Sequence, residues 1–320
     1  MVYINRNIPR VAGFPARGFW NLHFNHCIII LNVLQKFGYR KNRQDSRCWI
    51  KAGKERELNL TKIIAVANQK GGVGKTTTAV NLSACIAVAE RSTLLLDMDP
   101  QANATSGLGV DHRKLNKSIY EVLLKDEDIN EVVMQTAIPF LELIPSTIRL
   151  VGAEIELVNV MGRERVLSDV LKNLKKTYEY IFLDCPPSLG LLTINSLTAA
   201  TSILIPIQCE YYALEGLSQL LKTIRLVQKN LNPDLNIEGV LLTMFDNRLN
   251  LSNQVAEDVR KFFEDKVFDT IINRNVRLSE APSFGKPVIL YDAVCSGTES
   301  YIQLAEEVIG HESKKARKGA

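Results

Sequence analysis

The sequence lacks any apolar run long enough to cross a membrane, and it lacks paired cysteine motifs. A membrane-spanning helix needs about 20 consecutive apolar residues, and no stretch approaches that length, which predicts a soluble, cytoplasmic chain. The six cysteines form no CxxC pair, so we expect reduced thiols instead of a disulfide framework. No internal repeat or low-complexity tract is present, which excludes solenoid and fibrous architectures.

Residues 1–60 are poor in acidic and hydroxyl side chains. They carry eleven Lys and Arg against three acids, a net charge of +8, so residues 61–320 carry −4 in a chain whose net charge is +4. A basic nucleic-acid arm, a targeting presequence and translation from upstream of the true start are all compatible with this composition. A presequence would be rich in Ser and Thr, yet Ser46 is the only one before Thr61. We favour a misassigned start, with a flexible basic arm second.

The rest of the chain is long enough for one large domain. With 320 residues and 46% hydrophobic content, the sequence can bury a sizeable core, and residues 61–310 suit a single α/β domain. The expected strands are 63–67, 93–97, 141–144, 180–184, 202–207, 237–244 and 268–272. Helical segments separate them, at 75–88, 118–133, 164–177, 190–199, 211–230, 251–263 and 299–309. This alternation predicts a mostly parallel sheet with helices on both faces.

A phosphate-binding loop spans residues 70–78, with the sequence KGGVGKTTT between an apolar strand and a helix. Glycines let backbone N–H groups turn toward phosphates, and the positive end of the following helix dipole points at them. Lys75 is expected to reach the β- and γ-phosphates of a nucleotide triphosphate, and the Thr76 hydroxyl to bind Mg²⁺. The residues expected to contact the nucleotide here are Gly71, Gly72, Val73, Gly74, Lys75, Thr76 and Thr77.

Aspartates follow two of the other predicted strands. Asp97 and Asp99 come at the end of the strand 93–97, and Asp184 ends the strand 180–184. Since parallel strands of an open sheet present their carboxyl ends to one ligand site, these side chains are expected above the phosphates. We predict that Asp99 orients the attacking water, and that Asp97 and Asp184 belong to the Mg²⁺ site together with Thr76.

Lys70 is a second lysine, five residues before the usual one. With it, the loop resembles the deviant Walker A family, which includes ParA and Soj partition ATPases and MinD. The segments DMDPQANAT (97–105), CEYYALEGL (209–217), TMFDNR (243–248) and RNVRLSEAPS (274–283) are similar to chromosomal ParA of the Soj type. The resemblance covers about residues 62–309. Ala102 stands where that family usually has glycine.

The resemblance implies a SIMIBI-type P-loop NTPase that uses ATP and Mg²⁺ and is a slow, partner-stimulated ATPase. It implies that Lys70 reaches the partner's nucleotide in an ATP-bound homodimer, and that Asn275 and Pro282 lie near the adenine. Arg248 and Arg277 would bind duplex DNA without sequence preference, and a ParB-type protein would stimulate hydrolysis. The implied function is DNA partition by a cytoplasmic, nucleoid-associated protein.

Two other functions stay open. One is a DNA-bound regulator of replication or transcription with an ATP switch, and the other is a MinD-like positioning ATPase recruited to membrane. The C-terminal segment argues against the second, because the helix 299–309 carries acids and only modest aliphatics. We therefore expect no membrane partner. The helix is expected to pack on the core and to break at Gly310, which leaves residues 311–320 as a basic tail.

Overall fold

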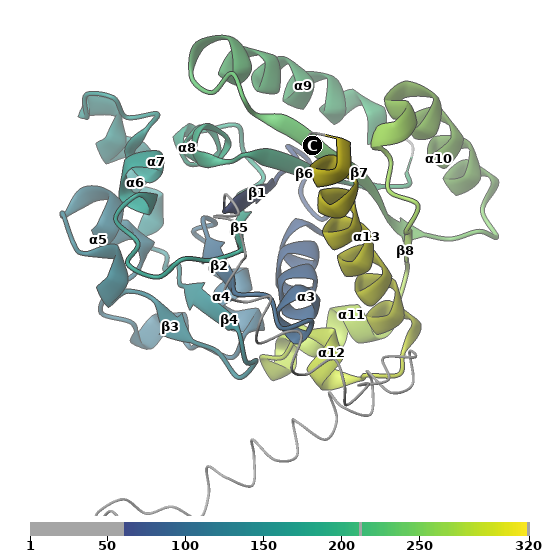
Figure 1. Ribbon diagram of the computed structural model, residues 1–320, viewed down its shortest axis with the longest axis horizontal. Coiled ribbons are helices and arrows are strands. Elements are labelled where there is room, and N and C mark those ends of the chain that lie inside the picture. The colour runs from purple at the N-terminus through teal and green to yellow at the C-terminus, as the bar shows by residue number, and fades with distance from the viewer. Residues whose placement is uncertain (1–60, 211–212, 319–320) are drawn as a thin grey trace, which may run out of the picture. The chain divides into compact units, whose positions relative to one another are not determined.

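The computed structural model describes residues 61–210 and 213–318, so the interpretations of residues 1–60 lie outside the described part of the chain. The described residues form one eight-stranded sheet with helices on both faces (Figure 1). The strand order is β3-β4-β2-β5-β1-β6-β7-β8. All pairings are parallel except that of β3 with β4. The predicted α/β fold with a mostly parallel sheet is confirmed.

The strands lie within a residue or two of their expected positions, apart from the short β8. Their bounds are β1 Lys62–Val66, β2 Thr93–Asp97, β3 Met134–Gln135, β4 Leu141–Ile144, β5 Tyr180–Asp184, β6 Ser202–Gln208, β7 Asn236–Phe245 and β8 Ile272–Asn273. The four central strands are almost wholly buried, as expected for parallel strands covered on both faces. β3, a two-residue antiparallel edge strand, carries no pattern long enough to be found from sequence.

Helices follow most of the strands. The α-helices are α3 Lys75–Val88, α4 Asn103–Gly107, α5 Ile119–Leu124, α6 Leu150–Glu156, α7 Val166–Leu171, α8 Leu191–Ala199, α9 Ala213–Asn230, α10 Asn250–Phe263, α11 Val276–Glu280, α12 Val288–Tyr291 and α13 Ser296–Lys318. Short 3₁₀ turns are η1 His112–Lys114, η2 Ile129–Glu131, η3 Leu157–Asn159, η4 Glu264–Lys266 and η5 Ala281–Phe284. None of the helices in this part of the chain is long and apolar enough to span a bilayer.

The nucleotide-loop helix α3 is held between the sheet and α13. All eleven of its residues from Thr78 to Val88 are buried. The Thr78 and Tyr301 hydroxyls hydrogen-bond at 3.2 Å and join α3 to α13. On the opposite face, α7, α8 and α9 cover the sheet (Figure 1). The expectation that the C-terminal helix packs on the core is therefore confirmed.

The helix predictions needed three corrections. α13 runs through Gly310 to Lys318, because a single helical glycine costs only about 1 kcal/mol and strong helix formers follow it. The expected helix 164–177 is only α7, because the Asn130 side chain bonds the backbone of Asn173 and Lys175 and so ends the helix there. The segment 118–133 is split into α5 and η2, and α6 was not anticipated.

The described cysteines are Cys85, Cys185, Cys209 and Cys295, and all four are free. Three of them are buried, so they serve as small apolar residues of the interior. This agrees with the expectation of reduced thiols for the described part of the chain. Cys27 and Cys48 lie outside the described residues.

Candidate functional site

The loop 68–74 leaves the carboxyl end of β1 and turns into α3. Gly72 and Gly74 have φ of 73° and 85°, a left-handed backbone that L side chains rarely adopt. The buried Asn68 holds the loop at its start, since its amide donates to the Pro206 carbonyl at 2.7 Å and its oxygen accepts from Lys70 N at 3.1 Å. From β7, the Thr243 hydroxyl donates to the Val73 carbonyl at 2.9 Å. The loop is therefore fixed from two neighbouring strands.

Lys75 is the first residue of α3, and only 7% of its surface is exposed. Its Nζ donates to the Lys70 carbonyl at 2.9 Å, across the loop. Burial lowers the pKa of Lys75, and the nearby charges of Asp184 and Asp99 partly offset this. A buried cation facing two carboxylates at a glycine-rich turn has the chemistry to hold phosphate oxygens.

Lys70 lies on the outer side of the same loop and pairs within its own chain. Its Nζ is 3.6 Å from Glu210 Oε2, and Arg274 is 3.7 Å from Glu210 Oε1. Glu210 follows the end of β6, so one carboxylate gathers two cations at the carboxyl edge of the sheet. The expected reach of Lys70 into a second chain would require it to leave this ion pair.

Asp97, fully buried at the end of β2, organises the switch segment that follows it. One of its oxygens accepts from the backbone N–H of Asp99, and the other accepts from the backbone and hydroxyl of Thr105 at 2.8 and 2.7 Å. Burial raises the pKa of Asp97 to about 6, and the Thr105 hydrogen bonds oppose that rise. Both oxygens are thus engaged in holding the segment, and the part of Asp97 in the Mg²⁺ shell stays a prediction.

The backbone conformation at Ala102 is one that favours glycine, the residue that the family usually has at this position. Its φ of 53° and ψ of 36° are left-handed, and it is completely buried at the start of α4. A non-glycine residue costs about 1–2 kcal/mol in that conformation. The chain therefore adopts here a backbone turn that glycine could adopt without this cost.

Asp184 ends β5 next to Asp97, its parallel partner residue in β2. Its two oxygens are buried, and neither has a hydrogen-bond partner of good geometry among the described residues, although the Thr76 hydroxyl is a near neighbour. Burial raises the pKa of Asp184 well above its usual value, the charge of Asp97 adds to this, and the Thr76 hydroxyl and Lys75 oppose it. A buried carboxylate with both oxygens unpartnered is costly, and a bound cation would remove that cost.

These residues fit Mg²⁺. The donors are the Thr76 hydroxyl and the Asp184 carboxylate, with Asp97 beside them, and Mg²⁺ prefers oxygen ligands. No group of three or more His, Cys, Asp or Glu side chains in the described ranges could form a complete metal cage. That agrees with Mg²⁺ chemistry, because this ion is normally held by one or two carboxylates together with waters and substrate phosphates.

Asp99 is nearly buried between Asp97 and the P-loop lysine. Its Oδ1 accepts from the Gln101 backbone at 2.9 Å, which orients the carboxylate, while its own N–H is fixed by Asp97. The charge of Asp99 acts on Lys75 and Asp184 alike. The fold therefore gathers Lys75, Asp97, Asp99 and Asp184, as expected where the carboxyl ends of parallel strands meet. The water-orienting role of Asp99 stays a prediction.

The expected adenine residues lie farther along the chain. Asn275 caps α11 by accepting from Arg277 N at 2.8 Å, and its amide donates to Ser296. Pro282 lies in η5 and lines a cavity of about 660 Å³ with Ser106 and Phe284, and no P-loop residue lines that cavity. The adenine contacts of Asn275 and Pro282 therefore stay predictions.

The expected DNA-binding arginines are exposed and paired. Arg248 forms a double hydrogen bond with Asp246 at 2.9 and 2.6 Å, and its side chain is 83% exposed. Arg277 pairs with Glu280 at 2.8 Å and with Asp292 at 3.2 Å. The ion pair between Arg277 and Glu280 is thus present, and DNA contact by either arginine stays a prediction.

Sequence reasoning did not single out several residues that position the site. Asn68, Thr105, Glu210 and Thr243 hold the loop, the switch and Lys70, as described above. Each lies in or beside a segment that the resemblance covers, so the segments could be found. The partners of Asn68, Glu210 and Thr243 could not be found, because they lie far away in the sequence. Thr105 lies only eight residues from Asp97, and its contact depends on how the switch segment folds.

The comparisons with known proteins agree with this geometry. The family model described as an AAA domain matches residues 61–237. The sporulation initiation inhibitor protein Soj of Bacillus subtilis is 60% identical over 249 residues, 78% of this chain and 98% of that protein. The chromosome partitioning protein ParA of Myxococcus xanthus is 58% identical over 80% of this chain and 90% of its own length.

Solved structures share the fold. One from Mycobacterium smegmatis, described as a cobyrinic acid a,c-diamide synthase with bound ADP and magnesium, has a TM-score of 0.70 and 38% identity, over 79% of this chain and 96% of that chain. The septum site-determining protein MinD of Pyrococcus horikoshii, complexed with Mg-ADP, has a TM-score of 0.65 and 27% identity, over 78% and 96%. By these similarities along most of both chains, the protein belongs to the ParA/Soj family of P-loop ATPases.

Proposed function

We propose that this chain is a DNA partition ATPase in which ATP and Mg²⁺ drive a sandwich dimer. The dimer binds duplex DNA without sequence preference, and ATP hydrolysis stimulated by a ParB-type partner releases it. The observation that carries the proposal is the buried group of Lys75, Asp99 and Asp184 at a P-loop with a second lysine. The name of the Myxococcus xanthus relative, chromosome partitioning protein ParA, supports the cellular role.

Mg²⁺, when bound, would neutralise charge on the phosphate oxygens. Within the chain, Lys75 would bind those oxygens, Thr76 and Asp184 would hold the ion, and Asp99 would orient the attacking water. The switch segment fixed by Asp97 would place Asp99 at the reacting phosphate. ATP can favour the dimer only if it binds the dimer more tightly than the single chain, and a lysine supplied by the partner would create that difference.

Lys70→Ala is expected to bind ATP as a single chain but not to form the ATP-dependent dimer. The reason is that the proposed target of Lys70 lies in the other chain, whereas Lys75 serves its own nucleotide. Sedimentation velocity of the full chain with Mg²⁺ and a non-hydrolysable ATP analogue measures the dimer. A Lys70→Ala protein that dimerises as well as the wild type would refute the role in trans.

Glu210→Gln is expected to strengthen the ATP-dependent dimer. This change releases Lys70 from its intrachain ion pair, and an exposed pair is worth about 0.2–1 kcal/mol. With two copies in a dimer, the dissociation constant should fall by roughly 2- to 30-fold. Glu257→Gln on α10 is the matched control, because it removes an exposed carboxylate elsewhere. If Glu210→Gln and Glu257→Gln both have the dimer dissociation constant of the wild type, the ion pair does not restrain Lys70.

DNA binding is proposed to use local patches, because residues 61–320 carry a net charge of −4 and so give no general attraction for a polyanion. Arg248 and Arg277 are exposed enough to reach phosphates, with Asp246, Glu280 and Asp292 as their present partners. Contacts with phosphate position a protein on DNA and do not read its sequence. ATP would control binding by bringing two such patches together in the dimer.

Arg248→Ala should weaken duplex binding equally for any sequence. Each phosphate contact contributes about 0.9 to the slope of log K against log salt, so a symmetric dimer should lose about 2 from that slope. Fluorescence anisotropy of labelled duplex DNA with ATP, at several salt concentrations, measures the affinity and its slope against salt. Arg113→Ala is a close control, since Arg113 pairs with Asp111 two residues earlier, as Arg248 does with Asp246. An Arg248→Ala/Arg277→Ala protein with unchanged affinity and slope would place the DNA surface elsewhere.

The partner and location follow from the same proposal. A pull-down from the native source with the Asp99→Ala protein and ATP should recover a DNA-bound, ParB-type protein, and DNA binding would make the chain nucleoid-associated. A regulator with an incidental ATPase would keep its DNA and partner contacts when hydrolysis is blocked and also when ATP is removed. Contacts that do not depend on ATP would therefore overturn the partition mechanism.

A further inference from the structure

A loop that follows β4 contacts the switch segment, residues 97–105. This loop, residues 145–149, leaves the sheet beside β2, because Ile144 at the end of β4 is the parallel partner of Leu96. The Ser146 N–H donates to the Thr105 hydroxyl oxygen at 2.9 Å. Ser146 and Thr105 are both completely buried. The loop after one strand therefore supports the switch segment that follows the neighbouring strand.

The two partners of the Thr105 hydroxyl fix its orientation. An N–H group can only donate a hydrogen bond, and an ionised carboxylate can only accept one. The Thr105 hydroxyl therefore accepts from Ser146 and donates to Asp97 Oδ2, which is 2.7 Å away. The Thr105 N–H donates to the same oxygen at 2.8 Å, so Asp97 caps α4, whose N-cap residue Ala102 makes no side-chain cap. Thr105 thus joins Asp97 to the loop 145–149.

The Asp97 carboxylate passes this support on to Asp99. Its Oδ1 accepts from the Asp99 N–H at 3.1 Å, and Asp99 Oδ1 in turn accepts from the Gln101 N–H at 2.9 Å. The two oxygens of a carboxylate turn together about the Cβ–Cγ bond, so the bonds made at Asp97 Oδ2 also direct Oδ1. The hydrogen bonds therefore continue from the loop 145–149, through Thr105 and Asp97, to the backbone of Asp99.

The loop 145–149 is itself fixed by α5, away from the P-loop. At its start, the Pro145 carbonyl accepts from the Ile119 N–H at 3.0 Å. In its middle, the Thr147 and Ser118 hydroxyls hydrogen-bond at 3.2 Å, and both residues are buried. Because these contacts come from a different helix, a change of the Thr105 side chain should leave the loop in place.

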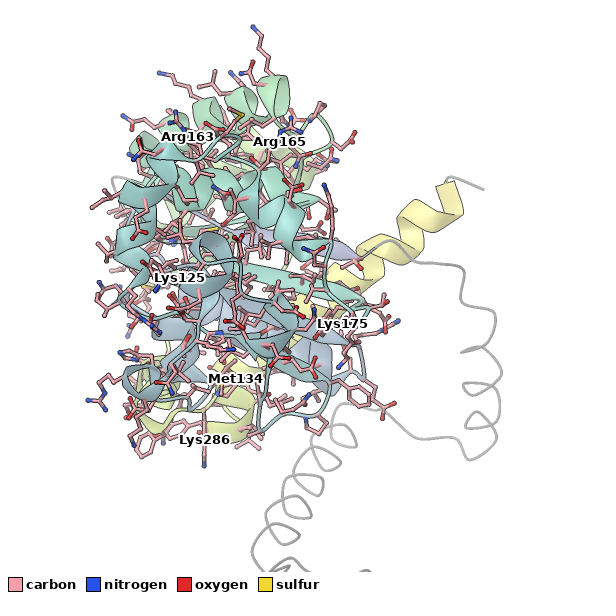
Figure 2. The ribbon with its side chains drawn as sticks, turned by 90° about the vertical axis from the view of Figure 1, so that its left-hand side faces the viewer. Lys125, Met134, Arg163, Arg165, Lys175 and Lys286 are labelled. Carbon is pink, nitrogen blue, oxygen red and sulfur yellow. The ribbon has the colours of Figure 1, made fainter. Side chains whose placement is uncertain are left out.

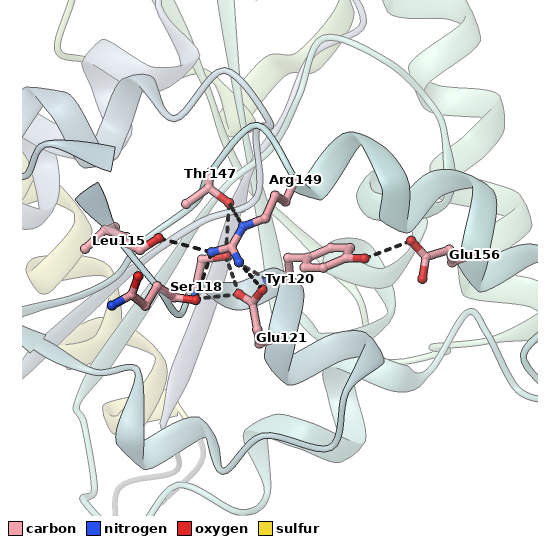
Figure 3. Close-up of polar contacts among 8 residues, drawn as sticks. Leu115, Ser118, Tyr120, Glu121, Thr147, Arg149 and Glu156 are labelled. Carbon is pink, nitrogen blue, oxygen red and sulfur yellow. Dashed lines mark hydrogen bonds and ion pairs between the residues drawn. The ribbon is translucent and has the colours of Figure 1, made fainter. Parts of the chain in front are cut away.

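The last residue of the loop, Arg149, extends this support to the surface. Figure 3 shows its guanidinium reaching the Glu121 carboxylate, at a distance of 2.7 Å. The Arg149 side chain is 39% exposed, whereas that of Glu121 is only 8% exposed. α5 and α6 lie on the side of the molecule that Figure 2 presents to the viewer, where Lys125 follows the end of α5. The contacts therefore reach from an ion pair at this surface to the buried switch segment.

We propose that Thr105 is a positioning residue for ATP hydrolysis. Its hydroxyl, held by the Ser146 N–H, keeps the Asp97 carboxylate turned so that Asp99 faces the reacting phosphate. This inference rests on the proposed function, because it takes Asp99 as the group that orients the attacking water. Misplacing a reacting group by about 1 Å can slow a reaction by about 100-fold. Loss of the Thr105 hydroxyl should therefore act on the rate of hydrolysis and not on the affinity for ATP.

The test is Thr105→Val in the full chain, which removes the hydroxyl and keeps the shape of the side chain. Single-turnover hydrolysis of ATP should slow by about 10- to 100-fold, because the Asp97 carboxylate loses one of its anchors. Binding of a fluorescent ATP analogue should be unchanged, since the P-loop keeps its contacts. Thr105→Ser retains the hydroxyl and should hydrolyse ATP at close to the wild-type rate. A Thr105→Ser protein as slow as Thr105→Val would overturn the proposal.

Thr93→Val is the matched control. Thr93 lies at the opposite end of β2 from Asp97 and is as buried as Thr105, and its hydroxyl donates to the Arg91 carbonyl at 2.9 Å. This control loses one buried hydroxyl and one hydrogen bond far from the switch segment, so it should hydrolyse ATP at the wild-type rate. An equal loss of rate in Thr93→Val would assign the effect to general packing and overturn the proposal.

Amide hydrogen exchange gives a second measurement. The Ser146 N–H loses its acceptor in Thr105→Val, so this amide should exchange faster than in the wild type while the amides of β4 keep their rates. If Thr105→Val does not fold, Thr105→Ala removes the same hydroxyl and carries the same expectations for exchange and hydrolysis. Unchanged exchange at Ser146 would show that the contact does not hold the loop and switch together, and the proposal would be wrong.

A double-variant cycle separates this proposal from the role of Asp99. If Thr105 acts through Asp99, Thr105→Val should slow hydrolysis no further in an Asp99→Ala protein, because residues that act as one unit are not additive. Additive losses would overturn the proposal. Wild-type hydrolysis in Thr105→Val together with slow hydrolysis in Asp99→Ala would overturn it too, and would leave the proposed function standing. Wild-type hydrolysis in Asp99→Ala would refute the role of Asp99 in the proposed function, and this inference with it.

Discussion

Lys75→Ala is expected to lose ATP binding, with an affinity at least about 100-fold weaker. Hydrogen bonds to charged groups contribute about 1.5–3 kcal/mol, and the buried ammonium group is also the cation that faces Asp184 and Asp99. Without it, phosphates would approach two uncompensated carboxylates. Titration with a fluorescent ATP analogue, at protein concentrations below those of the dimer, measures the loss.

Lys70→Ala is the control for this measurement. The two lysines lie five residues apart on one loop, but only Lys75 is buried and only Lys70 pairs with Glu210. The expected result is therefore opposite, with single-chain binding retained in Lys70→Ala. Equal losses in the two variants would show that both lysines serve the nucleotide of their own chain, contrary to the proposal.

Asp99→Ala is expected to slow ATP hydrolysis by about 100-fold or more while ATP binding changes little. Positioned acid–base groups contribute about 10²–10⁴-fold to rate, and Asp99 is oriented for such a role by Asp97 and Gln101. The nucleotide-bound dimer should accumulate, because water positioning is lost while the P-loop contacts are kept. Single-turnover hydrolysis together with sedimentation velocity separates the two effects.

Asp99→Asn distinguishes the carboxylate's charge from its hydrogen bond. Asparagine can still accept from the Gln101 backbone, so the switch segment should keep its conformation. A rate as low as that of Asp99→Ala would assign the effect to the carboxylate itself. Wild-type hydrolysis in Asp99→Ala would remove this residue from the mechanism and direct attention to other groups of the switch segment.

Much of the fold could be read from the sequence because its signals are local. Buried parallel strands appear as short aliphatic runs, and glycines with a lysine and threonine between such a strand and a helix mark the P-loop. The aspartates that end β2 and β5 could be placed together for the same reason, since parallel strands bring their carboxyl ends to one edge. The ParA/Soj family followed from these same segments.

Tertiary structure decided what depends on residues distant in sequence. Asn130 ends α7 early, and Glu210 holds Lys70 within its own chain. The apolar residues of α6 could be seen in the sequence, but a pattern cannot tell which face is buried when both are apolar. The ion pair of Arg149 with Glu121 and the hydrogen bond of Tyr120 with Glu156 join α6 to α5 (Figure 3). The sequence by itself thus determined the strands, the P-loop and the family, while packing determined how each charged side chain is paired, because those partners lie far apart in the chain.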